Sequence, residues 1–272
     1  MDLLEKSLVV IGGASGLGLS AARAFVEAGA RVVVAGHKRL AAERAARLLG
    51  QNAIAICADP CDPTTATRAV AQAVNAFGRL DGLYHAVGGT GRRMGDGPLH
   101  EISDMAWRIV LNLNLTAAMY SNRAAIRQFL LQRSGGSILN LGSVLGSFPP
   151  HGRLITHAYA AAESAMTGFS KALAAYYADR SIRVNVLAPG LVEPGGSVRE
   201  TGPPEFNGEA NPHFVETKQP LDGGRLGKPG DFDAAAVYFM SDGSRFTTAQ
   251  VLSVDGGWSV SEGQYEEENS GA

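Results

Sequence analysis

The stretch Leu8-Val9-Val10-Ile11-Gly12-Gly13-Ala14-Ser15-Gly16-Leu17-Gly18 decides the fold. A short apolar run, typical of a buried strand, leads into a glycine-rich turn and then into an Ala-rich segment typical of a helix. Glycines let the backbone approach a pyrophosphate closely, and the N-terminus of the following helix favours negative charge. The stretch therefore predicts a dinucleotide-binding turn, with ligand contacts from Gly12, Ser15, Gly16, Leu17 and Gly18.

The rest of the chain continues this alternation of strands and helices. The expected strands are residues 8–11, 31–35, 53–58, 83–87, 137–141, 182–188 and 250–254. The expected helices are residues 17–28, 39–49, 64–77, 103–132, 157–179 and 230–241. Uninterrupted apolar strands separated by helices predict a parallel sheet covered on both faces, and right-handed crossovers make it doubly wound. We therefore expect an α/β Rossmann fold with about seven parallel strands.

No repeat and no internal linker interrupts the pattern, which favours a single domain over residues 1–258. Residues 193–220 are rich in Gly and Pro without clear periodicity, and a loop of this length is typical of a substrate-binding segment. Residues 259–272, which end in an acidic run, are expected to form a solvated tail.

Composition excludes several classes of partner. Hydrophobic residues make up 45% and charged residues 18%, and the formal net charge is −2, which favours a compact domain without attraction to nucleic acid. No apolar run is long enough to cross a membrane, and the N-terminus lacks the pattern of a secretory signal, so a cytoplasmic location is expected. The only cysteines, Cys57 and Cys61, lack a second ligand cluster, so no metal site is expected.

The end of the second strand bears on the choice of cofactor. An acidic residue there would bind the adenosine ribose of NAD and repel a 2′-phosphate. The chain instead has Gly36-His37-Lys38-Arg39 at this position. The missing carboxylate and the cations His37, Lys38 and Arg39 favour NADP over NAD, although a solvated helix start would also explain the charges.

Several motifs in the right order resemble the short-chain dehydrogenase/reductase family, from about Leu8 to Trp258. The glycine spacing is similar to the family's T-G-x-x-x-G-x-G with Ile11 in place of Thr, and further matches occur at residues 182–190, 225–229 and 254–257. The resemblance implies a homodimer or homotetramer formed through the helices at 103–132 and 157–179. It also implies cofactor contacts from Asp59, Gly88, Pro189, Gly190 and Val192.

The resemblance also supplies a set of catalytic residues. Asn114 matches the asparagine that supports a water relay, Ser143 the serine that binds the substrate oxygen, and Tyr159 the acid/base tyrosine. Each residue type is common at element ends, but the three in this order are better explained by an active site.

One position departs from the family pattern. The residue four after Tyr159, on the same helix face, is Glu163 where the family has lysine. The interaction of a unit charge with a tyrosinate about 5 Å away, at an effective dielectric constant of about 20, is worth about 3 kcal/mol. Replacing the positive charge of lysine by the negative charge of glutamate therefore disfavours the tyrosinate and would slow a reaction that needs it by several powers of ten. This is an upper bound, because Glu163 could be protonated, turned away, or paired with Arg92, Arg93 or Arg153.

Three hypotheses for the function follow. The first is an NADP(H)-dependent oxidoreductase that interconverts a carbonyl and an alcohol on a bulky, largely apolar small molecule. The second is an enzyme of the same fold with non-redox chemistry (a dehydratase, isomerase or cyclase) that retains a cofactor and uses Glu163 as general base. The third is a non-catalytic NADP-binding protein, against which the retained Asn114, Ser143 and Tyr159 argue.

Overall fold

The computed structural model describes residues 2–149, 156–193 and 212–261. A single seven-stranded sheet lies at its centre, with all strands parallel and in the order β3-β2-β1-β4-β5-β6-β7. The strands are β1 Ser7–Ile11, β2 Arg31–Gly36, β3 Ala53–Cys57, β4 Gly82–His85, β5 Gly136–Leu141, β6 Ile182–Pro189 and β7 Val251–Val254. The predicted doubly wound Rossmann fold is confirmed.

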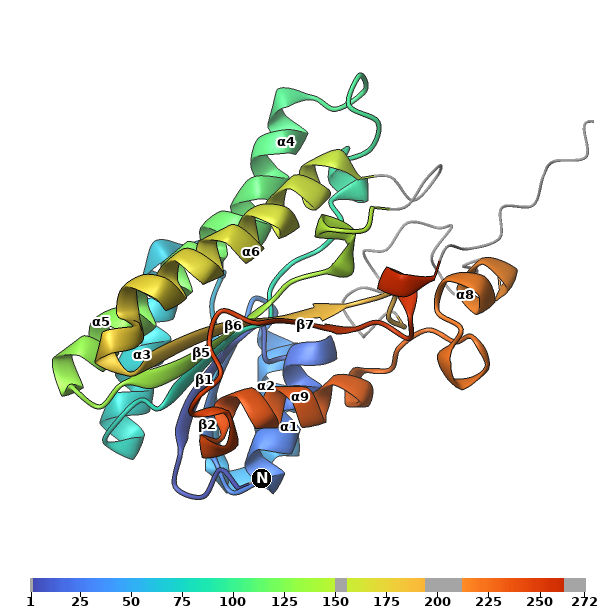
Figure 1. Ribbon diagram of the computed structural model, residues 1–272. Coiled ribbons are helices and arrows are strands. Elements are labelled where there is room, and N and C mark those ends of the chain that lie inside the picture. The colour runs from blue at the N-terminus through green and yellow to red at the C-terminus, as the bar shows by residue number, and fades with distance from the viewer. Residues whose placement is uncertain (1, 150–155, 194–211, 262–272) are drawn as a thin grey trace, which may run out of the picture.

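Helices cover both faces of the sheet (Figure 1). Helices α3, α5 and α6 lie on one side, and α1, α2 and α9 lie on the other. The helices are α1 Gly16–Glu27, α2 Arg39–Leu49, α3 Pro63–Phe77, α4 Asp104–Leu111, α5 Ala117–Gln132, α6 His157–Tyr177, α8 Pro212–Lys218 and α9 Asp233–Met240. Within the described ranges, no helix combines the length and apolar composition needed to cross a membrane.

The alternation of side chains along each strand divides the core in two. In β1, Leu8 and Val10 pack with α1, α2 and α9, whereas Val9 and Ile11 pack with α3, α5 and α6. Every residue of β1 is buried, because successive side chains point to opposite faces and both faces are covered. This explains why the central strands read as continuous apolar runs rather than as alternating patterns.

The helix predicted over residues 103–132 is interrupted in its middle. Helix α4 is followed by a five-residue π-helical turn, Asn112–Thr116, which continues into α5. The side-chain amide of Asn114 donates a hydrogen bond to the backbone carbonyl of Val110 (2.9 Å). Such wide turns often occur at functional sites, and this one places Asn114 below the turn that follows β4.

Two further predictions differ from the structure. Strand β4 ends at His85 rather than at residue 87, and the next residue, Ala86, passes close to Gly12. The segment predicted as a loop over residues 193–220 contains helix α8 at its end, and its residues 194–211 lie outside the described residues.

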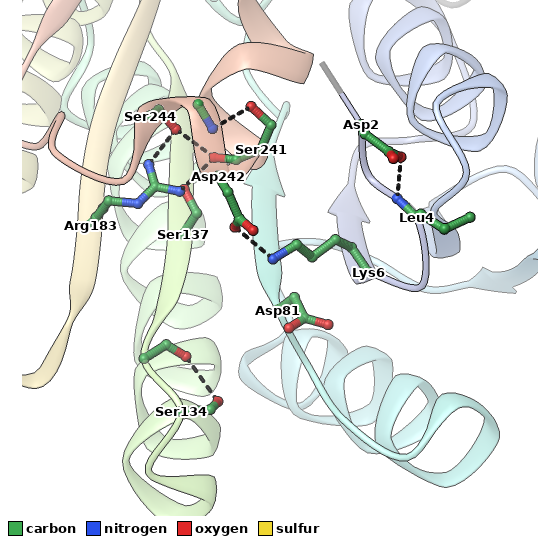
Figure 2. A network of polar contacts seen from close by, with 12 residues as sticks. Asp2, Leu4, Lys6, Asp81, Ser134, Ser137, Arg183, Ser241, Asp242 and Ser244 are labelled. Atoms are coloured by element: carbon green, nitrogen blue, oxygen red, sulfur yellow. Dashed lines mark hydrogen bonds and ion pairs between the residues drawn. The ribbon is translucent and has the colours of Figure 1, made fainter.

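Polar contacts fasten the sheet at the amino ends of its strands (Figure 2). Lys6, just before β1, forms an ion pair with Asp242 (2.7 Å), and Arg183 near the start of β6 donates to Ser244 (2.6 Å). Ser137, near the start of β5, donates to the Phe239 carbonyl at the end of α9 (2.7 Å). These contacts bind the C-terminal part of the chain to the sheet and leave the opposite, carboxyl edge of the sheet for a ligand.

We predict that Gly18→Ala lowers the stability of the fold. A Cβ at Gly18 would lie 2.3 Å from the backbone oxygen of Gly12, whereas a Cβ at Gly168, in α6, would meet no atom within 4 Å. Gly18→Ala should therefore reduce the free energy of unfolding by about 1–3 kcal/mol. Gly168→Ala should leave it unchanged or raise it by up to about 1 kcal/mol, because alanine is the better helix former. Urea unfolding measures both variants, and equal stabilities would contradict the packing argument.

Candidate active site

A cavity of about 960 Å³ lies at the carboxyl ends of the strands. Ligands bind at this edge of parallel sheets where the strand order reverses, here between β1 and β4. The volume of the cavity is at the upper end of the range for ligand pockets. Most of the predicted cofactor residues line it, namely Gly12, Ser15, Gly16, Leu17, His37, Lys38, Asp59, Gly88, Pro189, Gly190 and Val192. Ser143, Tyr159 and Glu163 line the same cavity.

Three of the predicted site residues lie outside the lining: Gly18, Arg39 and Asn114. Gly18 packs beneath the glycine turn, against the backbone of Gly12. Arg39 is the exposed first residue of α2, one position beyond the lining residue Lys38. Gly18 and Asn114 therefore support the cavity wall, and Arg39 does not line it.

The glycine turn has the shape that a pyrophosphate requires. Gly12 has φ 90°, and a Cβ there would lie 2.4 Å from the carbonyl oxygen of Ala86. Gly16 has φ 53°, and a Cβ there would meet nothing within 4 Å, so the backbone at Gly16 is open to the cavity. Helix α1 begins at Gly16, and its first amides donate no capping hydrogen bond to the Ser15 side chain. Uncapped amides at a helix N-terminus attract an anion, so the turn fits a phosphate group.

The end of β2 lacks an acidic side chain because of its packing. A Cβ at the buried Gly36 would lie 2.3 Å from the Cβ of Ala14 in the glycine turn, so this position has no space for a carboxylate. The exposed His37 and the half-buried Lys38 line the cavity next to it, together with the exposed Asp59 after β3. This end of the cavity therefore offers the Lys38 ammonium group and the His37 ring at the second strand and one carboxylate at the third.

Asn114 uses its amide group to hold the turn after β4. Its Oδ1 accepts the backbone N–H of Gly89 (2.8 Å), and its Nδ2 donates to the carbonyls of Gly89 (3.1 Å) and Val110 (2.9 Å). A Cβ at Gly88 would lie 2.7 Å from Asn114 Oδ1. Both amide donors are therefore used within the protein, and Asn114 positions the cavity wall at Gly88 and Gly89.

The side chains of Ser143, Tyr159 and Glu163 lie next to one another in the cavity. Ser143, after β5, accepts the backbone N–H of Leu145 (3.2 Å), and its hydroxyl group lies close enough to that of Tyr159 to lower the Tyr159 pKa. The Tyr159 hydroxyl also interacts with the Glu163 carboxyl group, one helical turn further along α6, and each group shifts the pKa of the other. The three residues that the sequence predicted as catalytic at these positions are thus brought together, with Tyr159 in the centre.

Glu163 is a buried acid with an incomplete set of partners. The residue is 5% exposed, and its Oε2 has no hydrogen-bond partner. Burial raises the pKa of Glu163 to about 8, although the hydrogen bond from Tyr159 acts in the opposite direction. Burial also raises the pKa of Tyr159, and the negative charge that Glu163 would carry raises it further. At neutral pH both groups are therefore protonated.

The structure decides among the alternatives for Glu163. The side chain is not turned away, because it lines the cavity and contacts Tyr159. No cation is among the causes of its pKa shift, although Arg92 and Arg93 line the same cavity. Arg153 lies outside the described residues. The protonated state is therefore the form that fits this environment.

Asp96, which the sequence analysis did not single out, fixes the start of α6. Its carboxylate oxygens accept the backbone N–H groups of Ala158 (3.0 Å) and Tyr159 (2.8 Å), and the residue is 7% exposed. The ring of His157 contacts the neighbouring carbonyl of Gly97 (3.0 Å) rather than the cavity. Asp96 lies more than 60 residues before Tyr159 in the chain, so no pattern of neighbouring residues predicts this contact.

The far wall of the cavity is apolar. Trp258 is 1% exposed and packs edge-on against Phe214 of α8, with ring centroids 5.7 Å apart. Its indole N–H donates to the Phe148 carbonyl (3.1 Å), which ties the C-terminal segment to the turn after β5. Trp258 and Leu145 line the cavity in the same cluster that contacts Tyr159. A largely apolar molecule would match this wall.

Both cysteines are free thiols, with Cys57 exposed and Cys61 partly buried. Among residues 2–149, 156–193 and 212–261, no three His, Cys, Asp or Glu side chains gather in a way that could hold a metal ion.

We predict that Glu163 makes stability depend on pH. The folded protein retains the Glu163 proton up to a pKa of about 8, whereas the unfolded chain loses it near 4.5. The stabilisation of the folded state by this proton is thus complete below pH 4.5, and it is lost as the pH rises towards 8. Between these values the unfolding free energy of the wild type should fall relative to Glu163→Gln by up to about 1.4 kcal/mol per pH unit. Parallel curves for the two proteins in urea titrations from pH 5 to 8 would contradict a buried neutral acid.

Comparison with known proteins places this site in a family. The family model described as enoyl-(acyl carrier protein) reductase matches residues 12–259. The chain is 33% identical over 261 residues to 2,5-dichloro-2,5-cyclohexadiene-1,4-diol dehydrogenase of Sphingobium indicum, which covers 95% of this chain and 98% of that protein. It is also 33% identical over 252 residues to galactitol 2-dehydrogenase (L-tagatose-forming) of Cereibacter sphaeroides, with 92% and 94% covered.

The fold comparison agrees. A short-chain type dehydrogenase/reductase from Mycobacterium ulcerans superimposes with a TM-score of 0.84 at 28% identity, over 97% of this chain and 93% of that chain. The family match extends over nearly the whole chain. The chain also has the glycine turn, the cavity at the carboxyl ends of the strands and the contact between Ser143 and Tyr159. The chain therefore belongs to the short-chain dehydrogenase/reductase family of nicotinamide-dependent oxidoreductases.

Proposed function

We propose that the protein is an NADP(H)-dependent oxidoreductase that interconverts a carbonyl and an alcohol on a small, largely apolar molecule. The observation that carries this proposal is the cluster of Ser143, Tyr159 and Glu163 inside the cavity that the glycine turn also lines. One cavity thus combines a phosphate-binding turn with a hydroxyl group able to move a proton.

Each residue would act through the contacts described above. A nicotinamide bound in the cavity supplies or accepts the hydride. Tyr159 gives its hydroxyl proton to the substrate oxygen in the reduction direction, and Ser143 orients that oxygen. Because burial and Glu163 keep Tyr159 protonated, the resting site is prepared for carbonyl reduction rather than for alcohol oxidation. Asp96 holds the backbone of Tyr159, which limits the positions that its ring can take.

The end of β2 supports NADP as the cofactor. Lys38 and His37 line the cavity where a 2′-phosphate would approach, and the packing of Gly36 against Ala14 leaves no space for the acidic residue that would repel it. Arg39 does not line the cavity, so within this segment the proposal assigns the phosphate contact to His37 and Lys38.

The apolar wall supports an apolar, ring-sized substrate. Trp258 and Leu145 lie on the side of the cavity that also includes Tyr159. A relative in the comparison is named for oxidising a chlorinated cyclohexadiene diol, and another for a linear sugar alcohol. The buried indole of Trp258 favours the cyclic, less polar class for this chain.

Association through the long helices is also part of the proposal. Exposed apolar side chains lie on the described surfaces of α4 and α5, including Met105, Ile109 and Leu131. Covering them in a homodimer or homotetramer would remove apolar surface from water.

A second candidate, non-redox chemistry, rests on Glu163 alone. A buried neutral acid stands where the family pattern has a cation, and it contacts Tyr159 directly. With a pKa of about 8, Glu163 is suited to give a proton at neutral pH and becomes a general base only at higher pH. A dehydratase, isomerase or cyclase would convert its substrate without net change in the oxidation state of the cofactor.

The first test is NADPH consumption with a broad panel of cyclic and linear carbonyls. Wild-type protein should turn over at least one of them, and Tyr159→Phe should lower that rate by at least about 100-fold because the proton donor is lost. Tyr176→Phe, in the exposed part of the same helix, is the matched control and should have no effect. If Glu163→Lys consumes NADPH and the wild type does not, the non-redox candidate takes precedence.

The cofactor is tested by calorimetric titration of Lys38→Ala. Removing the cation should weaken binding of NADP⁺ by about tenfold or more and leave binding of NAD⁺ within about twofold, since only NADP⁺ carries the 2′-phosphate. Arg39→Ala removes the same charge one residue further on and should change neither. Equal losses for both cofactors in Lys38→Ala would show that Lys38 has no role in selecting the phosphate.

A further inference from the structure

We propose that Glu163 is the proton reservoir of this site: its carboxyl group holds a proton while the cofactor is reduced and releases it when the oxidised, positively charged nicotinamide is bound. The inference rests on the proposed nicotinamide binding and adds to it a coupling between proton and cofactor charge.

Glu163 lies buried in the wall of the cavity. The side chain is only 5% exposed and lines the cavity together with Tyr159. One oxygen is reached by the Tyr159 hydroxyl, while Oε2 is buried without a partner. A Cβ placed on Gly142, which also lines the cavity, would lie 3.6 Å from Oε2. A buried polar atom without a partner costs free energy that a bound ligand can recover.

The groups around Glu163 supply no charge to balance a carboxylate. The segment after β5 presents Gly142, Ser143 and the backbone at Gly146, none of which carries a charge. Helix α6 itself presents Tyr159, whose pKa is raised, so that it stays a neutral donor. The cations that line the cavity, Lys38, Arg92 and Arg93, are not among the causes of the Glu163 pKa shift.

A positive charge introduced into the cavity therefore changes the proton affinity of Glu163. A lone buried carboxylate is unfavourable, and a nearby cation favours its ionised form. The oxidised nicotinamide ring is cationic, and the reduced ring is neutral. Bound oxidised cofactor should thus lower the pKa of Glu163, and ionised Glu163 should in return bind the oxidised form more tightly, because linkage is reciprocal.

The proton and electron balance of carbonyl reduction agrees with this role. A hydride passes from reduced nicotinamide to the carbonyl carbon, and Tyr159 gives its hydroxyl proton to the carbonyl oxygen. Once the Tyr159 proton has left, the neighbouring Glu163 carboxyl group becomes the donor and gives its own proton to Tyr159 Oη. The products are the alcohol, the neutral tyrosine, a Glu163 carboxylate and the cationic oxidised ring, so one negative and one positive charge appear together in the cavity.

The test compares the affinities for NADP⁺ and NADPH at pH 6.5 and pH 9 by calorimetry. The ratio of the NADPH to the NADP⁺ dissociation constant should rise about tenfold or more in the wild type, because Glu163 ionises over this range. The 2′-phosphate and the adenosine are common to both cofactors, so their titration cancels in the ratio. Glu163→Gln should show a ratio independent of pH, and Glu43→Gln, the same change at an exposed carboxylate of α2 outside the cavity lining, should behave as the wild type.

A second readout counts protons directly. Titrations at pH 7 in buffers of different ionisation enthalpy should show release of about one proton on binding NADP⁺ to the wild type, and close to none on binding NADPH. Glu163→Gln should release none with either form, and thermal unfolding at pH 7 confirms that the variant is folded.

The outcomes separate this inference from the proposed function. If both cofactors bind and the ratio is independent of pH in the wild type, or changes equally in Glu163→Gln, the reservoir is overturned while nicotinamide binding stands. If neither cofactor binds to folded wild type, nicotinamide binding itself fails, and the reservoir fails with it.

Discussion

The close approach of three backbone segments at the β1–α1 turn is the constraint on which the site depends. A Cβ at Gly12 would overlap the carbonyl of Ala86, and a Cβ at Gly18 would overlap the carbonyl of Gly12. Strands β1 and β4 and helix α1 can therefore meet only where side chains are missing. This contact sets the point where the strand order reverses, and the cavity opens directly above it. The same rule extends to β2, where Gly36 packs against Ala14.

Two buried acids show how hydrogen bonding decides what a carboxyl group does. Asp96 accepts two backbone N–H groups at the start of α6, so its position is fixed and its acceptors are used. Glu163, one turn further along the same helix than Tyr159, has a single partner and an unpaired Oε2. Asp96 therefore serves the structure by orienting Tyr159, whereas Glu163 keeps a proton that it can exchange. Burial is similar at both positions, and the difference lies in the donors that each one finds.

The polar contacts of the molecule are divided between the two edges of the sheet. At the amino ends of the strands, Lys6, Arg183 and Ser137 are engaged with residues of the C-terminal segment (Figure 2). At the carboxyl ends, Asn114 and Asp96 use their polar atoms to hold the loops that line the cavity. The first set stabilises the sheet, and the second fixes the shape of the site. Trp258 extends the fixed wall, because its indole N–H is bound to Phe148.

The sequence by itself determined the fold and most of the cavity lining. Strand periodicity and the glycine spacing act locally, through steric rules that each short segment obeys alone, so residues 8–18 sufficed to place the turn and the first strand. The family pattern likewise located Ser143, Tyr159 and Glu163 by their order in the chain.

Only the tertiary structure decided the state of Glu163 and the roles of Asp96, Asn114 and Trp258. The proton on Glu163 depends on how much water the fold excludes and on which donors reach it, and both are set by segments distant in the chain. Asp96 contacts Tyr159 across more than 60 residues, and Trp258 reaches Phe148 across 110. Such contacts follow from how the loops converge at the edge of the sheet, and a pattern of neighbouring residues does not encode them.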